Sequence, residues 1–184
     1  MCIRDRWQTD QGQYDREEPV FGACGAAAAY RRSMVEEIGF LDDVFFFSCE
    51  DVDIAWRAHL AGWEVRYTPA GIVYHKLKAS GGSGVVGSYH DGRNFLYVLW
   101  KNVPTSLLRR HAGDIARAQW RISREALRAW RGAAARARLR GQLAGLVGLA
   151  RLWPARRRIQ AARRVDDHTL AALLTPVDAK AAGE

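Results

Sequence analysis

The sequence predicts an α/β unit in its first part, followed by an all-helical region. Short strand-like stretches alternate with amphipathic stretches, and from Leu107 to Arg164 the composition changes to Ala, Leu, Arg and Trp, without a strand pattern. Charge divides the chain at nearly the same place: residues 103–165 contain 16 Arg against only Asp114 and Glu125, whereas the residues before them carry a net charge of −3. We therefore expect a mildly acidic domain followed by a basic helical one.

Composition places the chain among globular proteins. Its 184 residues are 48% hydrophobic and 26% charged, which excludes a disordered chain. The three cysteines are odd in number and lack metal-ligand spacing, so we expect reduced thiols in the cytoplasm. No run reaches the ~18 apolar residues of a spanning helix, and no apolar signal segment begins the chain. We expect four parts: 1–18 without an interpretable pattern, 19–104, 105–165 and a flexible tail over 166–184.

The first elements are small and apolar. Residues 19–30 include Gly22 and Gly25, which permit close backbone approach, so this stretch is either a strand-like wall of a pocket or a tightly packed piece of core. Residues 31–38 predict a short helix, and Gly39 suits its C-terminal cap.

An apolar run, Phe45–Phe47, then leads into three carboxylates crowded into four positions, Glu50, Asp51 and Asp53. A helix is expected to follow, because Val52, Ala55, Trp56 and Leu60 recur at helical spacing before Gly62; Ser48 or Asp51 could cap it. Carboxylates beside aromatic rings are costly unless a metal, a proton or a hydroxyl group uses them.

Two short strands and a long helix complete this part. Residues 63–68 alternate as a half-buried strand does, and residues 72–75 predict a second strand that ends on His75. Residues 76–87 are rich in Gly and Ser and predict a mobile loop. Residues 88–102 predict a helix that Pro104 ends.

Over residues 19–104 an ordered set of short motifs resembles the C-terminal half of a family 2 glycosyltransferase. The matching pieces are Gly22-Ala23-Cys24-Gly25-Ala26, Tyr30-Arg31-Arg32, Ile38-Gly39-Phe40-Leu41-Asp42, Phe45-Phe46, Glu50 to Arg57, Ala61-Gly62-Trp63, Tyr67-Thr68-Pro69, His75 and Arg93-Asn94. The nearest likeness is to rhamnosyltransferase-like enzymes of bacterial cell-surface polysaccharide synthesis. The resemblance implies an incomplete GT-A (nucleotide-diphospho-sugar transferase) half. Because nothing before Pro19 supplies the nucleotide-binding half with its DxD motif, the chain is expected to be a fragment.

The activity that the resemblance implies is hexosyl transfer with inversion. A sugar, with rhamnose the first candidate, would pass from a nucleotide-diphosphate sugar to a saccharide or lipid-linked acceptor. The acceptor hydroxyl needs a base as it attacks, and the departing diphosphate needs positive charge.

Asp51 is the predicted catalytic base, because it matches the second acid of the family's Glu-Asp motif. A carboxylate at a helix start is held ionised by the N-terminal amides, and its neighbours Glu50 and Asp53 raise its affinity for a proton. Glu50, Asp53, Gly25 and Arg57 are expected to bind or orient the acceptor, with Asp53 pairing to Arg57 four positions on. The alternative is an acidic cluster at the helix start with packing duties only.

His75 is the predicted metal ligand, since a histidine at this place in similar enzymes completes a site begun by the DxD carboxylates. Imidazole with carboxylates and phosphate oxygens suits Mg²⁺ or Mn²⁺, and the other ligands would lie outside this chain. A surface histidine at a strand end is the alternative. Arg93 is expected to bind the donor phosphates. Lys76 and Lys78 beside the Gly-Ser loop could do the same or remain solvated.

The basic helices suggest an anionic membrane surface as a partner, on the inner face of the cell membrane. Arg would meet headgroups while Trp120, Trp130 and Trp153 settle at the interface. Nucleic acid is less expected, because no recognised nucleic-acid fold accompanies the Arg patch. The remaining alternative is a solvated helical hairpin that covers the catalytic domain. A different function class also stays open: a non-catalytic truncated module that binds membrane or nucleic acid through these helices.

Overall fold

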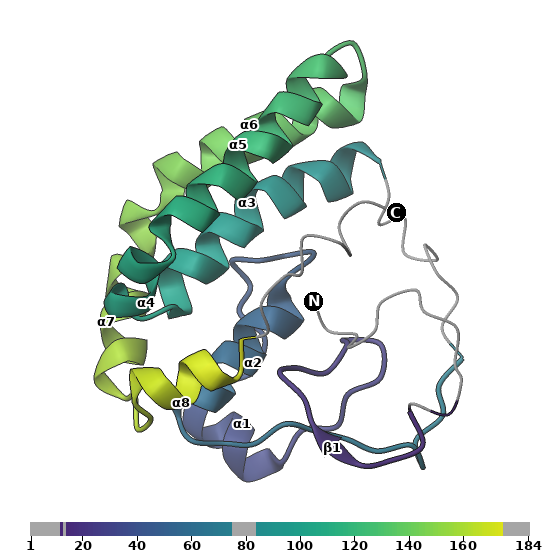
Figure 1. Cartoon of the computed structure of the whole chain (residues 1–184), viewed down its shortest axis with the longest axis vertical. Coiled ribbons are helices and arrows are strands. Elements are labelled where there is room, and N and C mark those ends of the chain that lie inside the picture. Colours follow the sequence, from purple (N-terminus) through teal and green to yellow (C-terminus); the bar gives the residue numbers. More distant parts are fainter. Residues whose placement is uncertain (1–11, 13, 75–83, 175–184) are drawn as a thin grey trace.

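The computed structural model describes residues 12, 14–74 and 84–174, and helices dominate this part of the chain (Figure 1). The helices are α1 (Arg32–Ile38), α2 (Glu50–Leu60), α3 (Val85–Asn102), α4 (Thr105–Arg110), α5 (Ala112–Arg128), α6 (Ala133–Gly148), α7 (Trp153–Ala161) and α8 (Asp167–Ala172), with a 3₁₀ turn η1 (Ala150–Leu152). The strands are β1 (Glu18–Pro19) and β2 (Arg66–Tyr67). The long helices α3, α5 and α6 occupy one end of the molecule, and β1, α1, α2 and α8 occupy the other.

The predicted strands are largely absent from the described residues. β1 and β2 form one antiparallel ladder with Glu18 opposite Tyr67, so the strand expected over 63–68 shrinks to two residues. The strand expected over 72–75 is wrong for residues 72–74, which are exposed coil. An alternating pattern forms a strand only where a neighbour accepts its backbone hydrogen bonds, and no further ladder exists in the described ranges. The incomplete GT-A architecture therefore stays a prediction.

The helices agree better with the sequence. α1 ends at Gly39, whose φ of 79° is the left-handed conformation that a C-terminal glycine allows. α3 ends two residues before Pro104, as expected, but starts at Val85, inside the predicted loop. The capping prediction for α2 is wrong: Cys49 is the N-cap residue and no side chain caps the helix, because the Ser48 hydroxyl donates instead to Asp91 Oδ1 at 2.7 Å.

The larger of two buried clusters joins the two predicted regions. Phe45 and Trp56, from the acidic part, lie in one buried cluster with Tyr97 of α3 and with Leu107 and Leu152 of the basic part. The basic helices are therefore packed on the first part of the chain rather than extended from it.

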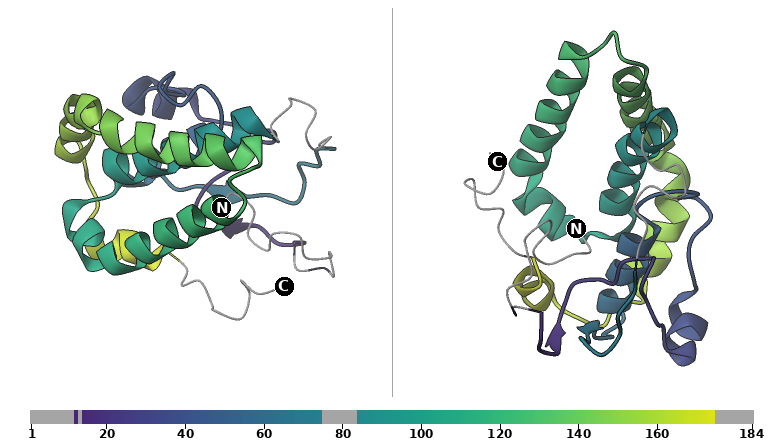
Figure 2. Two further views of the ribbon diagram at one scale, coloured as in Figure 1. Left: turned by 90° about the horizontal axis from the view of Figure 1, so that it is seen from above. Right: turned by 90° about the vertical axis from the view of Figure 1, so that its right-hand side faces the viewer.

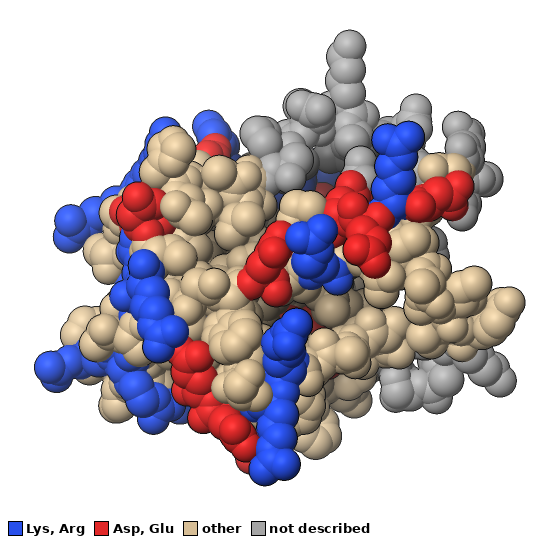
Figure 3. Space-filling view, turned by 90° about the horizontal axis from the view of Figure 1, so that it is seen from below, with Lys and Arg blue, Asp and Glu red and all other residues tan. Residues whose placement is uncertain are grey.

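The tail predicted over 166–184 is ordered at its start. Asp166 caps α8 by accepting a hydrogen bond from the Thr169 amide, and Leu170 is buried in the shared core. Nearby, Arg164 forms an ion pair with Glu37 of α1. Seen from below, this end of the molecule carries acidic and basic side chains beside one another (Figure 3). The flexible-tail prediction is thus wrong for its first residues, because Leu170 is buried in the core and Leu173 and Leu174 pack against it.

α6 packs against α3 at unusually short range. A Cβ added to Gly141 would lie 2.1 Å from the Tyr89 carbonyl oxygen, and one added to Gly145 would lie 3.1 Å from the Arg93 carbonyl oxygen. α3 contributes Gly92, where a Cβ would lie 2.6 Å from the Arg138 carbonyl oxygen. The two backbones touch because these positions lack side chains, which fixes α3 and hence the residues that it presents to the candidate site.

Gly141→Ala is expected to lower the free energy of unfolding by about 1–3 kcal/mol, because the added methyl group meets a backbone atom that cannot turn aside. Gly113→Ala is the matched control, since that helical glycine has no atom within 4 Å of the added Cβ. The control should raise stability by about 0.4–1 kcal/mol through the unfolded chain. Urea unfolding of both variants makes the comparison; an equal gain at both positions would contradict the close helix contact.

Candidate functional site

Asp51 lies in the first turn of α2, half-buried, at the wall of a large cavity. Its Oδ2 accepts a hydrogen bond from the Gly25 amide at 3.3 Å, and its Oδ1 accepts one from the Val52 amide at 2.8 Å. The sequence separation between Gly25 and Asp51 is 26 residues. The structure thus brings together two of the predicted site residues, and backbone amides hold the carboxylate in place.

The cavity beside Asp51 has a volume of about 870 Å³. One wall is the small-residue stretch that the sequence predicted to line a pocket, and that prediction is confirmed. The tight-packing alternative also applies at Gly22, where an added Cβ would lie 2.9 Å from the Ala55 side chain. Further lining comes from α1, α2, both strands and the coil after β2, including Met34, Ile54, Tyr67 and Val73. A cavity of this size can enclose a saccharide-sized ligand.

The loop that leads into Asp51 is conformationally strained. Phe46, Ser48 and Cys49 have φ values of 55°, 68° and 71°, in the left-handed region that side chains other than glycine rarely adopt. Each such residue costs on the order of 1–3 kcal/mol unless the surroundings impose it. Strain of this kind concentrates at functional sites, and here it immediately precedes the three clustered carboxylates.

Two neighbouring side chains of α3 impose the loop's shape. Asn94, fully buried, donates through Nδ2 to the carbonyl oxygens of Phe45, Phe47 and Ser48 at 2.7–2.9 Å. Arg93 donates through Nη2 to the Val44 and Phe45 carbonyl oxygens. Its Nε donates to Asn94 Oδ1 at 2.8 Å, which also orients the amide.

Arg93 therefore has a structural role that the sequence did not predict. Its guanidinium also lies 5.2 Å from the Tyr97 ring and 5.8 Å from the Tyr89 ring. These contacts turn it toward the loop, and its predicted contact with donor phosphates stays a prediction. The signal for Asn94 was present in the matched Arg-Asn pair, although no role had been assigned to it.

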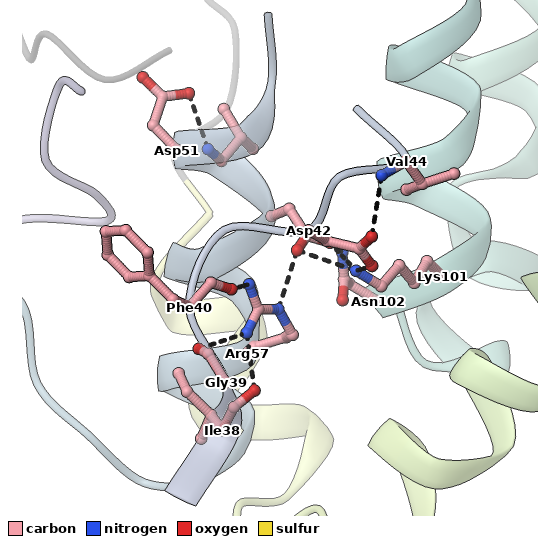
Figure 4. A network of polar contacts seen from close by, with 11 residues as sticks. Ile38, Gly39, Phe40, Asp42, Val44, Asp51, Arg57, Lys101 and Asn102 are labelled. Carbon is pink, nitrogen blue, oxygen red and sulfur yellow. Dashed lines mark hydrogen bonds and ion pairs between the residues drawn. The ribbon is translucent and has the colours of Figure 1, made fainter. Parts of the chain in front are cut away.

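Behind Asp51, the same helix carries a buried charge network (Figure 4). Asp53 has no solvent exposure; its Oδ2 lies 2.8 Å from Arg57 Nε and its Oδ1 lies 2.8 Å from Lys101 Nζ. Asn102 adds a hydrogen bond of 2.7 Å to the same carboxylate. The predicted Asp53–Arg57 pair is confirmed. Neither side chain can touch an acceptor from this position, so of the two predicted roles only orientation is compatible with the geometry.

The network reaches the turn after α1. Arg57 donates through its two Nη atoms to the carbonyl oxygens of Ile38, Gly39 and Phe40 at 2.7–2.9 Å. Asp42 binds Lys101 Nζ at 2.6 Å. Partial burial raises the pKa of Asp42, but the hydrogen bonds from Lys101 and the Val44 amide outweigh it, so this pKa lies below its ordinary value. α1, α2 and α3 are thus tied together beneath Asp51. No sequence pattern had singled out Lys101.

Glu50 has a buried oxygen that lacks a partner. Its Oε2 is inaccessible to solvent and has no hydrogen bond within the described part of the chain. Its Oε1 lies 3.7 Å from where a Cβ on Gly25 would be, so the side chain reaches the same corner as Asp51. Glu50 is not among the residues that line the cavity, so this oxygen is a buried acceptor without a described partner rather than a contact for a ligand.

The predicted metal ligand His75 lies outside the described residues. Val73, two positions earlier, lines the same cavity as Asp51. Among residues 12, 14–74 and 84–174, no three His, Cys, Asp or Glu side chains are grouped to hold a metal ion. The divalent cation stays a prediction.

Cys49 is expected to resist alkylation at neutral pH. Burial raises the pKa of its thiol to about 11, so the reactive thiolate is scarce. Cys24 is half-buried at the cavity wall and is also unpaired. Iodoacetamide labelling of the native protein, read by peptide mass spectrometry, should modify Cys24 well before Cys49. Equal labelling in the folded state would contradict the burial of Cys49.

Comparison with known proteins gives a partial match. No family model matches the chain, and no solved structure does. Two curated proteins, both named N-acetylglucosaminyl-diphospho-decaprenol L-rhamnosyltransferase, match at 31% identity over 114 residues; they come from Mycobacterium tuberculosis strains CDC 1551 / Oshkosh and ATCC 25618 / H37Rv. The match covers 60% of this chain and 34% of each relative, so the chain spans about a third of their length. The rhamnosyltransferase-like resemblance is thereby supported at the level of a distant relative.

Proposed function

We propose that this chain carries the acceptor-side part of a family 2 glycosyltransferase of GT-A type. The reaction is transfer of a sugar, L-rhamnose being the first candidate, from a nucleotide-diphosphate sugar to a saccharide or lipid-linked acceptor. The relatives are named for rhamnosyl transfer to an N-acetylglucosaminyl-diphospho lipid, which supports this choice of sugar and acceptor.

The observation that carries the proposal is the placement of Asp51. Its carboxylate is fixed by the Gly25 and Val52 amides at the wall of an 870 Å³ cavity. A fixed carboxylate that faces a cavity can accept the proton of an acceptor hydroxyl. The hydroxyl oxygen then bonds to the anomeric carbon, the bond from that carbon to the diphosphate oxygen breaks, and the diphosphate leaves on the opposite side. One such displacement inverts the anomeric configuration.

The neighbouring residues have supporting roles in this proposal. Glu50, which lies beside Asp51 and Gly25, orients the acceptor indirectly, through the first turn of α2 and the segment that it contacts. Asp53 and Arg57 act from beneath, by fixing α2 to α1 and α3. Mg²⁺ or Mn²⁺, with His75 among its ligands, would supply the positive charge that the departing diphosphate needs.

Sugar transfer is the direct test. The assay uses nucleotide-diphosphate L-rhamnose with an N-acetylglucosaminyl-diphospho-polyprenol acceptor, and mass spectrometry detects the disaccharide lipid. It is run on the 184-residue chain and on the longest reading frame that contains it. Rhamnosylated product that requires Asp51 supports the proposal; absence of product from both proteins, with a panel of nucleotide sugars, contradicts it.

A further inference from the structure

The helices α5 and α6 form an antiparallel hairpin at the end of the molecule away from the candidate site (Figure 2). Gln142 Nε2 donates to Gln119 Oε1 at 2.9 Å, and the Ser123 hydroxyl lies 3.0 Å from Gln142 Oε1. These contacts identify the edges by which the two helices meet. The side of α6 that carries Gly141 and Gly145 packs on α3.

The opposite side of the hairpin is apolar and exposed. On α5, Gln119 and Ser123 mark the edge that meets α6, and Trp120 and Leu127 are rotated from that edge about the helix axis by a little under a quarter turn. On α6, Leu143 is rotated from Gln142 by about a quarter turn. Because the helices are antiparallel, both rotations lead to the same side, away from α3. We call this surface the hairpin face and define it by Trp120, Leu127, Leu143, Leu146 and Val147, each between 58% and 75% exposed.

Arginines flank the hairpin face in two places. Continuing the same rotation on α5 brings Arg121, Arg124 and Arg128 to its outer edge, all exposed. On α6, Arg136 and Arg140 are also exposed and lie on the same side as Leu143 and Val147, two turns nearer the hairpin turn, where Arg136 donates to the Trp130 and Arg131 carbonyl oxygens. Arg124 lies 5.5 Å from the Trp120 ring. The two helices contain only Asp114 and Glu125 as acids, whereas the end seen from below mixes both signs (Figure 3). An apolar surface with a cationic row along one edge and further arginines at one end is typical of a helix pair that lies in a bilayer interface.

We propose that the hairpin face docks on an anionic lipid bilayer. Its Trp and Leu side chains enter the boundary between headgroups and acyl chains, and the arginines around it meet the lipid phosphates. This inference rests on the hairpin alone and is independent of the proposed sugar transfer. A second copy on the same face would bring the arginines of the two copies together, which opposes self-association. Bound nucleic acid would place its charged phosphate backbone against the apolar side chains of the hairpin face, which makes it a poorer fit than lipid.

Vesicle flotation tests the inference without an activity assay. The full chain is mixed with phosphatidylcholine vesicles, with or without phosphatidylglycerol, at low and high salt. We expect binding only to the phosphatidylglycerol vesicles and weaker binding at high salt, because salt screens the arginine–phosphate attraction.

Two double variants separate the contributions. Arg121→Gln with Arg124→Gln should weaken partitioning roughly 30-fold, about fivefold for each cation near an anionic surface. Trp120→Ser with Leu143→Ser should weaken it by at least about tenfold. The matched controls are Arg32→Gln with Arg66→Gln, which removes the same charge elsewhere, and Tyr74→Ser at a side chain 96% exposed. Circular dichroism checks that each variant is folded.

The outcomes are distinct. Loss of binding in the hairpin variants but not in the controls supports the inference. If the charge control lost as much vesicle binding as the hairpin variants, binding would depend on net charge alone, and the inference would be overturned. Absence of vesicle binding, tighter binding to a duplex oligonucleotide than to vesicles, or a dimer that Leu143→Ser dissolves would each overturn it as well.

Discussion

Asp51→Asn is expected to lower the rate of sugar transfer by about 10²–10⁴-fold, the usual contribution of a positioned general base. Asparagine has nearly the same shape, but its single side-chain oxygen can accept from only one of the Gly25 and Val52 amides, and it cannot accept the hydroxyl proton. The free energy of unfolding should fall by about 1–2 kcal/mol, because the variant loses the interaction of the carboxylate with the helix dipole and one amide hydrogen bond. The loss should appear in kcat, because acceptor binding does not require the proton to move.

The control for this prediction is Asp43→Asn, which removes a carboxylate that is exposed in the loop after α1. It should leave transfer unchanged. Full activity of Asp51→Asn would remove Asp51 as the base and turn attention to Glu50. A loss of activity that paralleled a loss of folded protein would instead indicate that Asp51 has only the packing duties considered at the outset.

The part of the site that the sequence predicted is local. The start of α2, the Asp53–Arg57 pair and the glycine cap of α1 all depend on residues within a few positions of one another, so spacing alone is informative. The meeting of Gly25 with Asp51 is not local. The sequence indicated it only through an ordered set of family-like motifs.

The part that the sequence did not predict depends on contacts between distant segments. Asn94 lies 46–49 residues from the carbonyl groups that it binds, and Lys101 lies 48 residues from Asp53. No periodicity reports such pairs. Leu170 shows the same limit at the C-terminal end, because the contact of this short helix with the core joins segments far apart in the sequence.

The failed strand predictions have a different cause. Residues 63–68 and 72–74 have the alternation of strands, but a strand is stable only beside a partner. Within the described residues, β2 pairs only with the two residues of β1. A helix makes its backbone hydrogen bonds within its own segment and needs no partner strand. The helix predictions were therefore confirmed where the strand predictions were not.

Asp53→Asn changes a residue only two positions from the proposed base, but its main effect should be on stability rather than on the rate of sugar transfer. We expect the free energy of unfolding to fall by about 3–5 kcal/mol, the usual cost of removing one partner from a buried ion pair. The variant leaves Lys101 and Arg57, 1% and 6% exposed, without the carboxylate that they share. Asp42 remains close to Lys101 but is partly solvated, so it offsets only part of the buried positive charge.

Urea unfolding measures this cost, and Glu36→Gln is its matched control. Glu36 pairs with Arg32 at the same four-residue spacing as Asp53 with Arg57, but both side chains of this pair are exposed, so its loss should cost only about 0.3–0.5 kcal/mol. A cooperative Asp53→Asn protein that lost less than about 1 kcal/mol would show that the network is not what ties α2 to α1 and α3. If the large loss is found, Asp53 holds Asp51 in position without contacting the acceptor itself. Two acids on one turn of α2 then have separate roles, Asp51 in the reaction and Asp53 in stability.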